Sequence, residues 1–117
     1  MSGEARPAPG LPSEVLAGVD ALRPRYPTEE ALLLPALHLA QAANGGWLPA
    51  STIEAVADLL HLPASTVAGV VSFYDMFHER PVGRHRVRLC TNLSCQLRGA
   101  EELAQLLHQE LGVAEGD

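Results

Sequence analysis

Prolines and glycines divide residues 12 to 80 into short apolar-periodic segments, and this division constrains the fold more than any other feature of the sequence. Apolar residues recur within each segment at every third or fourth position, which is the spacing of one face of a helix. Aromatic residues make up only 4% of the chain, against 47% for all apolar types, so a core must be built from Leu, Val and Ala. That mixture favours helices. We therefore predict a mainly α chain with an N-terminal helical bundle over residues 12–80.

The first two predicted helices have clear boundaries. One follows Pro12 and carries its apolar residues at Val15, Leu16, Val19 and Leu22. Thr28 suits the N-cap of the second helix, because its hydroxyl can accept a hydrogen bond from a free N–H of the first turn. Pro35 lies inside this segment and removes one helical hydrogen bond, so we expect a bend there unless the helix begins later. The second helix should end at Ala43, before Asn44-Gly45-Gly46.

Two further helices complete the predicted bundle. Ser51 or Thr52 should cap the third helix, and Pro63 suits the first position of a fourth helix that continues to Phe77. We expect the core to include Leu37, Val56, Val70 and Phe73. The aromatic-rich segment from Val67 to Phe77 and the turn at Trp47 should help to dock a partner, because apolar residues on more than one face of a small bundle need a second surface to cover them.

The sequence period changes after Pro81-Val82-Gly83. Three arginines (Arg84, Arg86, Arg88) alternate with His85, Val87 and Leu89, a pattern that predicts a strand ending at Cys90. Apolar residues return to helical spacing from Ala100 to Leu111, and Gly112 is the expected stop. Residues 81–117 are therefore predicted to form one β-α unit. Residues 1–11, rich in Gly, Pro, Ala and Ser, should form a disordered lead-in.

Charge and hydropathy exclude several classes of function. The net charge is −6, which argues against a general affinity for nucleic acid. The N-terminus lacks the apolar stretch of a signal peptide, and no segment approaches the roughly 20 apolar residues of a membrane span. We expect no membrane insertion and a reducing, cytoplasmic setting. The lone histidines (His38, His61, His108) should be surface or capping residues, and no independent catalytic site is evident.

The two cysteines are the candidate site. Cys90 ends the predicted strand and Cys95 precedes the predicted helix, so both thiols should lie on one loop. A helix N-terminus and the nearby Arg98 should lower thiol pKa values and favour the thiolate, which binds metal. Alternatively, both are small apolar core residues. A thioredoxin-type disulfide is disfavoured because that pair has two intervening residues. Zinc with His78 or His85 matches no common spacing.

Several longer stretches resemble one known family. They are Leu34-Pro35-Ala36-Leu37-His38-Leu39-Ala40-Gln41, Gly46-Trp47-Leu48, Val70-Val71-Ser72-Phe73-Tyr74-Asp75-Met76-Phe77, Pro81-Val82-Gly83, Cys90-Thr91-Asn92-Leu93-Ser94-Cys95 and Arg98-Gly99-Ala100-Glu101-Glu102-Leu103. Over residues 28 to 112 the sequence is similar to the 24-kDa subunit family of respiratory complex I, whose bacterial members are the E subunits of NADH-quinone oxidoreductase. A plant-type ferredoxin is excluded, because Arg98 stands where its third cysteine would be.

The resemblance implies a helical docking part followed by a thioredoxin-like ferredoxin domain that binds a 2Fe-2S cluster, with Cys90 and Cys95 as two of its four metal ligands. It also implies a flavin-bearing partner subunit that holds FMN and NADH and passes electrons singly to the cluster, in the peripheral arm of a membrane-bound complex. Related subunits of NAD-reducing hydrogenases and NAD-dependent formate dehydrogenases share the pattern. Five arginines lie near the cysteines in the sequence: Arg80, Arg84, Arg86, Arg88 and Arg98. Their positive charge would stabilise the more negative, reduced cluster. Alternatively, they form an ordinary solvent-exposed strand face without an effect on a cluster.

The sequence departs from the family in one respect. Family members continue through more strands and a second cysteine pair, whereas this sequence ends at Asp117 without a further cysteine. The ferredoxin domain is thus incomplete here, and we interpret the sequence as a fragment. Two rival interpretations stay open: a helical docking module without a cluster, and a small zinc-stabilised regulatory domain.

Overall fold

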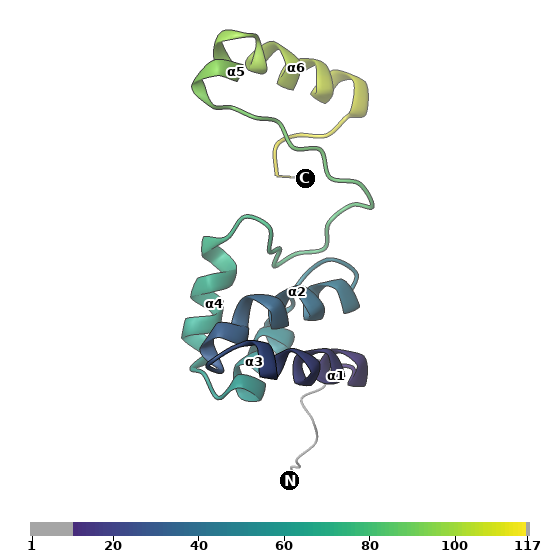
Figure 1. Cartoon of the computed structure of the whole chain (residues 1–117). Helices are drawn as coiled ribbons and strands as arrows, with labels where there is room; N and C mark the ends of the chain where they lie inside the picture. Colours follow the sequence, from purple (N-terminus) through teal and green to yellow (C-terminus); the bar gives the residue numbers. More distant parts are fainter. Residues whose placement is uncertain (1–10, 117) are drawn as a thin grey trace. The chain divides into compact units, whose positions relative to one another are not determined.

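The computed structural model describes residues 11–116, and every regular element in that range is helical (Figure 1). The elements are α1 (Ser13–Leu22), the 3-10 turns η1 (Arg23–Arg25) and η2 (Glu30–Leu32), α2 (Leu33–Ala43), α3 (Ala50–Leu60), α4 (Ala64–Phe73), α5 (Leu93–Leu97) and α6 (Ala100–Leu111). The chain divides between Pro81 and Val82 into two compact units. No helix within residues 11–116 is long and apolar enough to cross a membrane. The predicted mainly α class is confirmed.

Helices α1 to α4 form the first unit, in which each helix packs on the next in sequence (Figure 1). The side chains that fill its centre are almost wholly aliphatic, as the composition predicts. The most deeply buried are Val15, Val19, Leu32, Leu37, Leu48, Val56, Leu60, Val67 and Val71. Leu37 and Val56 are fully buried, as predicted, and Val70 packs at the edge of the core.

The prediction that Phe73 belongs to the core is wrong, because this side chain is 79% exposed. Helix α4 ends at Phe73 rather than at Phe77, and the backbone is already extended at Tyr74. The turn that follows brings Phe77 back into the core, where it is 5% exposed. The apolar spacing therefore continues to Phe77, past the end of the helix, and Phe77 rather than Phe73 enters the core.

Pro35 does not bend α2. The helix begins at Leu33, so Pro35 is its third residue and lies in the first turn, where backbone N–H groups have no helical partner. The sequence left two possible starts for this helix, and the structure shows the later one. Thr28 acts upstream: its Oγ1 accepts a hydrogen bond from the Ala31 N–H at 3.1 Å and fixes the approach to η2.

The predicted caps of the third and fourth helices need correction. Helix α3 begins at Ala50 after Pro49, so Ser51 and Thr52 lie inside its first turn rather than at its cap. Thr52 is buried, at 2% exposure. Pro63 occupies the position before α4 instead of the first helical position. In both cases a proline at the N-cap supplies the extended backbone that precedes the helix. The prediction missed this role because it looked for polar capping residues.

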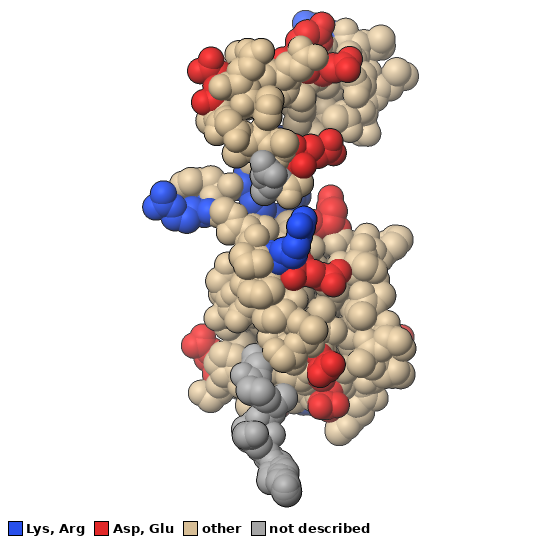
Figure 2. Space-filling model, turned by 180° about the vertical axis from the view of Figure 1, so that it is seen from behind, with Lys and Arg blue, Asp and Glu red and all other residues tan. Residues whose placement is uncertain are grey.

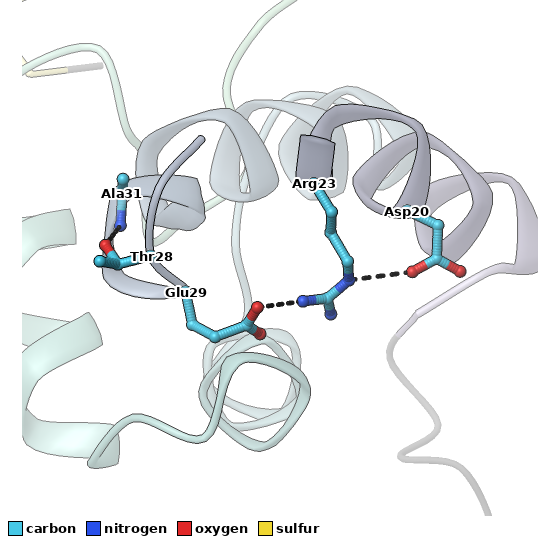
Figure 3. A network of polar contacts seen from close by, with 5 residues as sticks. All are labelled: Asp20, Arg23, Thr28, Glu29 and Ala31. Atoms are coloured by element: carbon cyan, nitrogen blue, oxygen red, sulfur yellow. Dashed lines mark hydrogen bonds and ion pairs between the residues drawn. The ribbon is translucent and has the colours of Figure 1, made fainter. Parts of the chain in front are cut away.

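An ion-pair network joins the end of α1 to the segment before α2 (Figure 3). The Arg23 guanidinium donates through Nε to Asp20 Oδ1 at 3.1 Å and through Nη1 to Glu29 Oε2. The hydrogen bond to Glu29, followed by that to Asp20, raises the pKa of Arg23. Arg23 therefore bridges two turns across the prolines that separate the first two helices.

Helices α5 and α6 belong to the second unit. Helix α6 spans Ala100–Leu111, and Gly112 ends it with a φ of +69°, as predicted. The strand predicted over residues 84–90 is wrong for this structure, since those residues have no regular structure. A strand needs a paired neighbour, and no segment of residues 11–116 provides one. The predicted lead-in lies outside the described residues except for Leu11, which packs on the core of the first unit.

Candidate functional site

The two cysteines lie at the start of a short helix that the sequence does not reveal. Cys90 lies in the irregular segment between Pro81 and α5, and Cys95 is the third residue of α5. Asn92 occupies the N-cap, with φ −66° and ψ 168°. The loop expected between the cysteines is thus half helical, and the turn of α5 carries Cys95 back toward Cys90. Helical spacing cannot reveal α5, because five residues are too few to show a period.

The two thiols contact each other. The Cys90 Sγ accepts hydrogen bonds from the Asn92 backbone N–H and from the Cys95 thiol, and these two contacts lower the pKa of Cys90. The same contact raises the pKa of Cys95, which donates its proton to Cys90 and is opposed by the negative charge of a Cys90 thiolate. Cys90 is exposed and Cys95 is half-buried. Cys90 is therefore the more acidic of the two thiols.

This pattern corrects the electrostatic prediction. The helix N-terminus and Arg98 are expected to make both thiols more acidic, but only the pKa of Cys90 is lowered, and Asn92 and Cys95 are the causes. Arg98 is exposed beyond the end of α5. The local contacts of Cys90, rather than the number of nearby charges, thus make it the more acidic of the two thiols.

Arginine nevertheless dominates the segment that leads to the cysteines. Arg84, Arg86 and Arg88 are all exposed, and Figure 2 shows blue atoms gathered on this part of the chain while red carboxylates are prominent around α6. Because no strand forms there, the structure does not place the three guanidinium groups on one sheet face. They constitute a solvated basic segment next to the thiols.

The donor set present fits one half of an iron-sulfur site. A 2Fe-2S cluster of the all-cysteine type uses four thiolates, and the chain supplies Cys90 and Cys95. Within residues 11–116 no group of three or more His, Cys, Asp and Glu side chains could hold a metal ion. The two thiols, which lie on one turn, thus make up half of such a ligand set. The zinc interpretation gains no third ligand from His78 or His85.

The lone histidines have structural roles, as predicted. His108 Nδ1 lies 2.8 Å from the Val113 carbonyl oxygen, just past the end of α6. His61 adopts a left-handed conformation at the end of α3, with a φ of +59°. The His38 ring packs on Phe77 with 4.9 Å between ring centroids.

A second feature, on the first unit, is not predicted from the sequence. The Gln41 side chain donates through Nε2 to the Met76 carbonyl at 3.0 Å and accepts from the His78 N–H at 2.9 Å. The His78 carbonyl in turn accepts from the Leu48 N–H at 2.7 Å. Gln41 thus fixes the turn that follows α4. In the sequence, this role is indicated only by the presence of a polar residue on the otherwise apolar face of α2.

That turn presents an aromatic edge. Phe73 is exposed and packs edge-on against Tyr74, with 4.9 Å between ring centroids, and Tyr74 packs in the same manner on Phe77 at 6.4 Å. Trp47 is half-buried beside the Asn44 side chain, whose Nδ2 donates to the Trp47 carbonyl at 3.1 Å. An exposed phenylalanine held on a rigid support is typical of a surface that a partner covers.

Comparison with protein families gives a match over residues 19–117, to the family described as thioredoxin-like [2Fe-2S] ferredoxin. The match includes both cysteines and most of the helical unit. It extends well beyond half of the chain.

Curated relatives give a consistent result. The sequence is 41% identical over 91 residues to the E subunit of NADH-quinone oxidoreductase from Rickettsia bellii (strain RML369-C), an alignment that covers 76% of this chain and 54% of the relative. The corresponding protein of Rickettsia conorii (strain ATCC VR-613 / Malish 7) is 40% identical over the same shares. The E 2 subunit of NADH-quinone oxidoreductase from Rhizobium meliloti (strain 1021) is 37% identical over 85% of this chain and 58% of its own length. The chain spans about half the length of the curated relatives it matches.

Proposed function

The chain belongs to the thioredoxin-like [2Fe-2S] ferredoxin family, and from this premise we propose that it is the N-terminal part of an electron-transfer subunit of an NADH-quinone oxidoreductase. Cys90 and Cys95 provide two of the four thiolates that hold the cluster, and two further thiolates come from outside this sequence. The similarity to curated E subunits over 76% of the chain supports the type of complex.

The observation that carries the proposal is the paired geometry of the thiols. Cys90 and Cys95 interact on one turn, Cys90 is the more acidic of the two, and neither is engaged in a packed core. This argues against the interpretation of both as ordinary core residues, which would be buried. Two adjacent thiols at the start of a helix suit the ligation of one iron of a cluster.

When bound, the cluster would accept single electrons that a flavin releases after it has taken a hydride from NADH. The residues of this chain would bind and tune it. The Asn92 N–H, which already donates to the Cys90 sulfur, would continue to stabilise negative charge there and favour the reduced state. The arginines of residues 84–88 would add a long-range contribution of the same sign.

The partner in this proposal is the flavin-bearing, NADH-binding subunit, within the cytoplasmic peripheral arm of a membrane-bound complex. Residues 12–80 form the docking part, and residues 81–117 begin the cluster domain. Phe73, Tyr74 and Trp47 are the residues that support docking, because they are aromatic, Phe73 is exposed, and Gln41 fixes the turn that follows Phe73 and Tyr74.

The proposal is tested in the assembled complex, using the full-length subunit that contains this sequence. Cys90→Ser and Cys95→Ser should each abolish the NADH-reducible electron paramagnetic resonance signal of this cluster while leaving flavin reduction intact. Ser94→Ala, a control within the same turn, should retain the signal. If both cysteine variants kept the signal with unchanged g-values, the assignment of the ligands would be wrong.

A docking module without a cluster is the second candidate, and one observation favours it. The first unit has a complete core of its own, whereas this sequence holds only half a ligand set. Measurements of electron transfer and of binding to the flavin-bearing subunit distinguish the cluster-binding role from the docking role. If a full-length variant without both cysteines restored electron transfer as well as assembly, the docking role alone would remain.

A further inference from the structure

The part of the first unit that carries the exposed Phe73 contains negative charge only. Residues 26–79 include no Lys or Arg and six carboxylates: Glu29, Glu30, Glu54, Asp58, Asp75 and Glu79. Glu29 pairs with Arg23, and the other five are exposed. Residues 80–100, by contrast, include five arginines and no Asp or Glu. Charges of opposite sign are thus separated along the chain, and Phe73 lies within the acidic part.

One of these carboxylates lies beside Phe73. The Phe73 side chain is 79% exposed, and its ring packs edge-on against Tyr74. Asp75 is exposed and follows Phe73 by two residues, so the Cα atoms of the two residues are at most about 7 Å apart. An exposed aromatic ring and an exposed carboxylate therefore share one small area of the surface.

Glu79 lies at the other end of the same turn. The His78 carbonyl accepts a hydrogen bond from the Leu48 N–H at 2.7 Å, which brings the peptide between His78 and Glu79 against the peptide between Trp47 and Leu48. Glu79 is therefore close to the backbone of Trp47.

The turn that carries both carboxylates is held in place by Gln41. Its side chain bonds to the Met76 carbonyl and to the His78 N–H, and Asp75 and Glu79 directly flank these two residues. The backbone positions of both carboxylates are thus fixed relative to the first unit before any partner binds. A surface that is already ordered loses less conformational entropy on association.

We propose that this turn docks onto a positively charged face of the flavin-bearing subunit, in which an apolar recess receives the Phe73 ring and Arg or Lys side chains at its edge meet Asp75 and Glu79. The inference rests on the proposed docking function and adds the chemistry of the partner. A central aromatic residue surrounded by a polar rim is the usual organisation of a protein interface. Charges on such a rim steer association and act mainly on its rate.

The same charges disfavour a second copy of the chain as the occupant. A two-fold interface brings one surface patch against itself. Asp75 and Glu79 of one copy would then lie close to Asp75 and Glu79 of the other, and like charges that meet across an interface oppose binding. A basic partner neutralises both carboxylates instead.

The test measures the association of the full-length subunit that contains this sequence with the purified flavin-bearing subunit, by stopped-flow fluorescence. At low ionic strength, Asp75→Lys and Glu79→Lys should each lower the association rate constant by about tenfold. Near 1 M salt, where screening reduces the Debye length to about 3 Å, the variants and the unchanged protein should associate at similar rates. Glu14→Lys on α1 changes the net charge by the same amount and should have a much smaller effect. Circular dichroism verifies that each variant is folded.

Equal association rates for Asp75→Lys, Glu79→Lys and Glu14→Lys at low ionic strength would overturn the proposal. An association rate of the unchanged protein that did not fall with added salt would overturn it as well, and so would dimerisation of the subunit alone that Phe73→Ala abolished. Phe73→Ala distinguishes this inference from the function on which it rests. Weaker binding of Phe73→Ala with no effect of the charge variants would remove the basic partner face alone, whereas unchanged binding of Phe73→Ala would remove this surface from the proposed docking function.

Discussion

At the scale of single residues, hydrogen bonds to backbone determine both features on which function depends. The Asn92 N–H lowers the pKa of Cys90, and the Gln41 side chain fixes the turn that follows the exposed Phe73. Neither contact could be predicted from sequence, because both depend on where the backbone turns rather than on residue type. The cysteines themselves could be predicted, since thiols are rare and their position before a helix is visible in the sequence.

Replacement of Gln41 by Leu should destabilise the first unit by about 1–3 kcal/mol, because the Met76 carbonyl and the His78 N–H lose their partner in a half-buried turn. The matched variant Gln41→Glu can still accept from His78 but cannot donate to Met76, so its loss should be intermediate. Urea unfolding followed by circular dichroism measures both. Equal stability of all three proteins would show that solvent replaces Gln41 without cost.

The pH dependence of alkylation should differ between the two thiols. Because the pKa of Cys90 is lowered and that of Cys95 is raised, iodoacetamide should react at Cys90 at lower pH than at a free cysteine, and at Cys95 only at higher pH. Peptide mapping of the reduced chain at each pH separates the two rates.

Asn92→Pro gives a sharp control for this effect. Proline fits the φ of −66° at this position but lacks the N–H that donates to Cys90. The alkylation midpoint of Cys90 should therefore move to higher pH in this variant. An unchanged midpoint would mean that the Asn92 N–H does not stabilise the thiolate.

At the scale of elements, the longer helices were predictable, whereas α5 was missed and the predicted strand is absent from residues 84–90. A helix satisfies its own backbone hydrogen bonds, so the apolar periodicity of α1, α3 and α6 and the glycine after α6 were sufficient to place them. A strand depends on a neighbour, and the alternation of Arg84, Arg86 and Arg88 says nothing about whether that neighbour is present. The fourth helix was predicted to continue to Phe77, but α4 ends at Phe73. The apolar spacing suggested the longer helix because Phe77 continues that spacing from outside α4.

Pro35→Ala should change stability by no more than about 1 kcal/mol. Pro35 lies in the first turn of α2, where it removes no helical hydrogen bond, so alanine has little strain to relieve. Thermal unfolding of the two proteins is the measurement. A gain near the roughly 3 kcal/mol that a proline costs inside a helix would show that α2 begins earlier than Leu33.

At the scale of the whole molecule, the two units differ in how completely they bury their apolar side chains. The first has a continuous apolar core, whereas the second leaves large apolar side chains exposed, among them Leu93, Leu97, Leu103, Leu106 and Leu111. The two thiols lie on its irregular segment and on the short helix α5. Residues 11–116 contain no group of three or more side chains that could hold a metal ion. The first unit should therefore fold on its own, and the second should bind a metal cluster only as part of a longer chain.

Core and surface variants of the first unit should separate folding from assembly. Leu37→Ala should cost about 2–5 kcal/mol, because it leaves a cavity at a fully buried position. Phe73→Ala should leave stability nearly unchanged, since the side chain is 79% exposed, but should weaken binding to the flavin subunit. Binding is measured with the full-length subunit by calorimetry. A folded Phe73→Ala variant with unchanged affinity would exclude Phe73 from the docking surface.

Iron and acid-labile sulfide content, measured after anaerobic reconstitution and gel filtration, tests the central claim most directly. The 117-residue chain should retain almost no cluster, because it provides two of four thiolates on a turn without supporting strands. The full-length subunit should retain close to two irons and two sulfides per chain, and Cys90→Ser or Cys95→Ser should remove most of both. A monomeric 117-residue chain that retained a complete cluster, or a full-length subunit that loaded normally without both cysteines, would contradict the account.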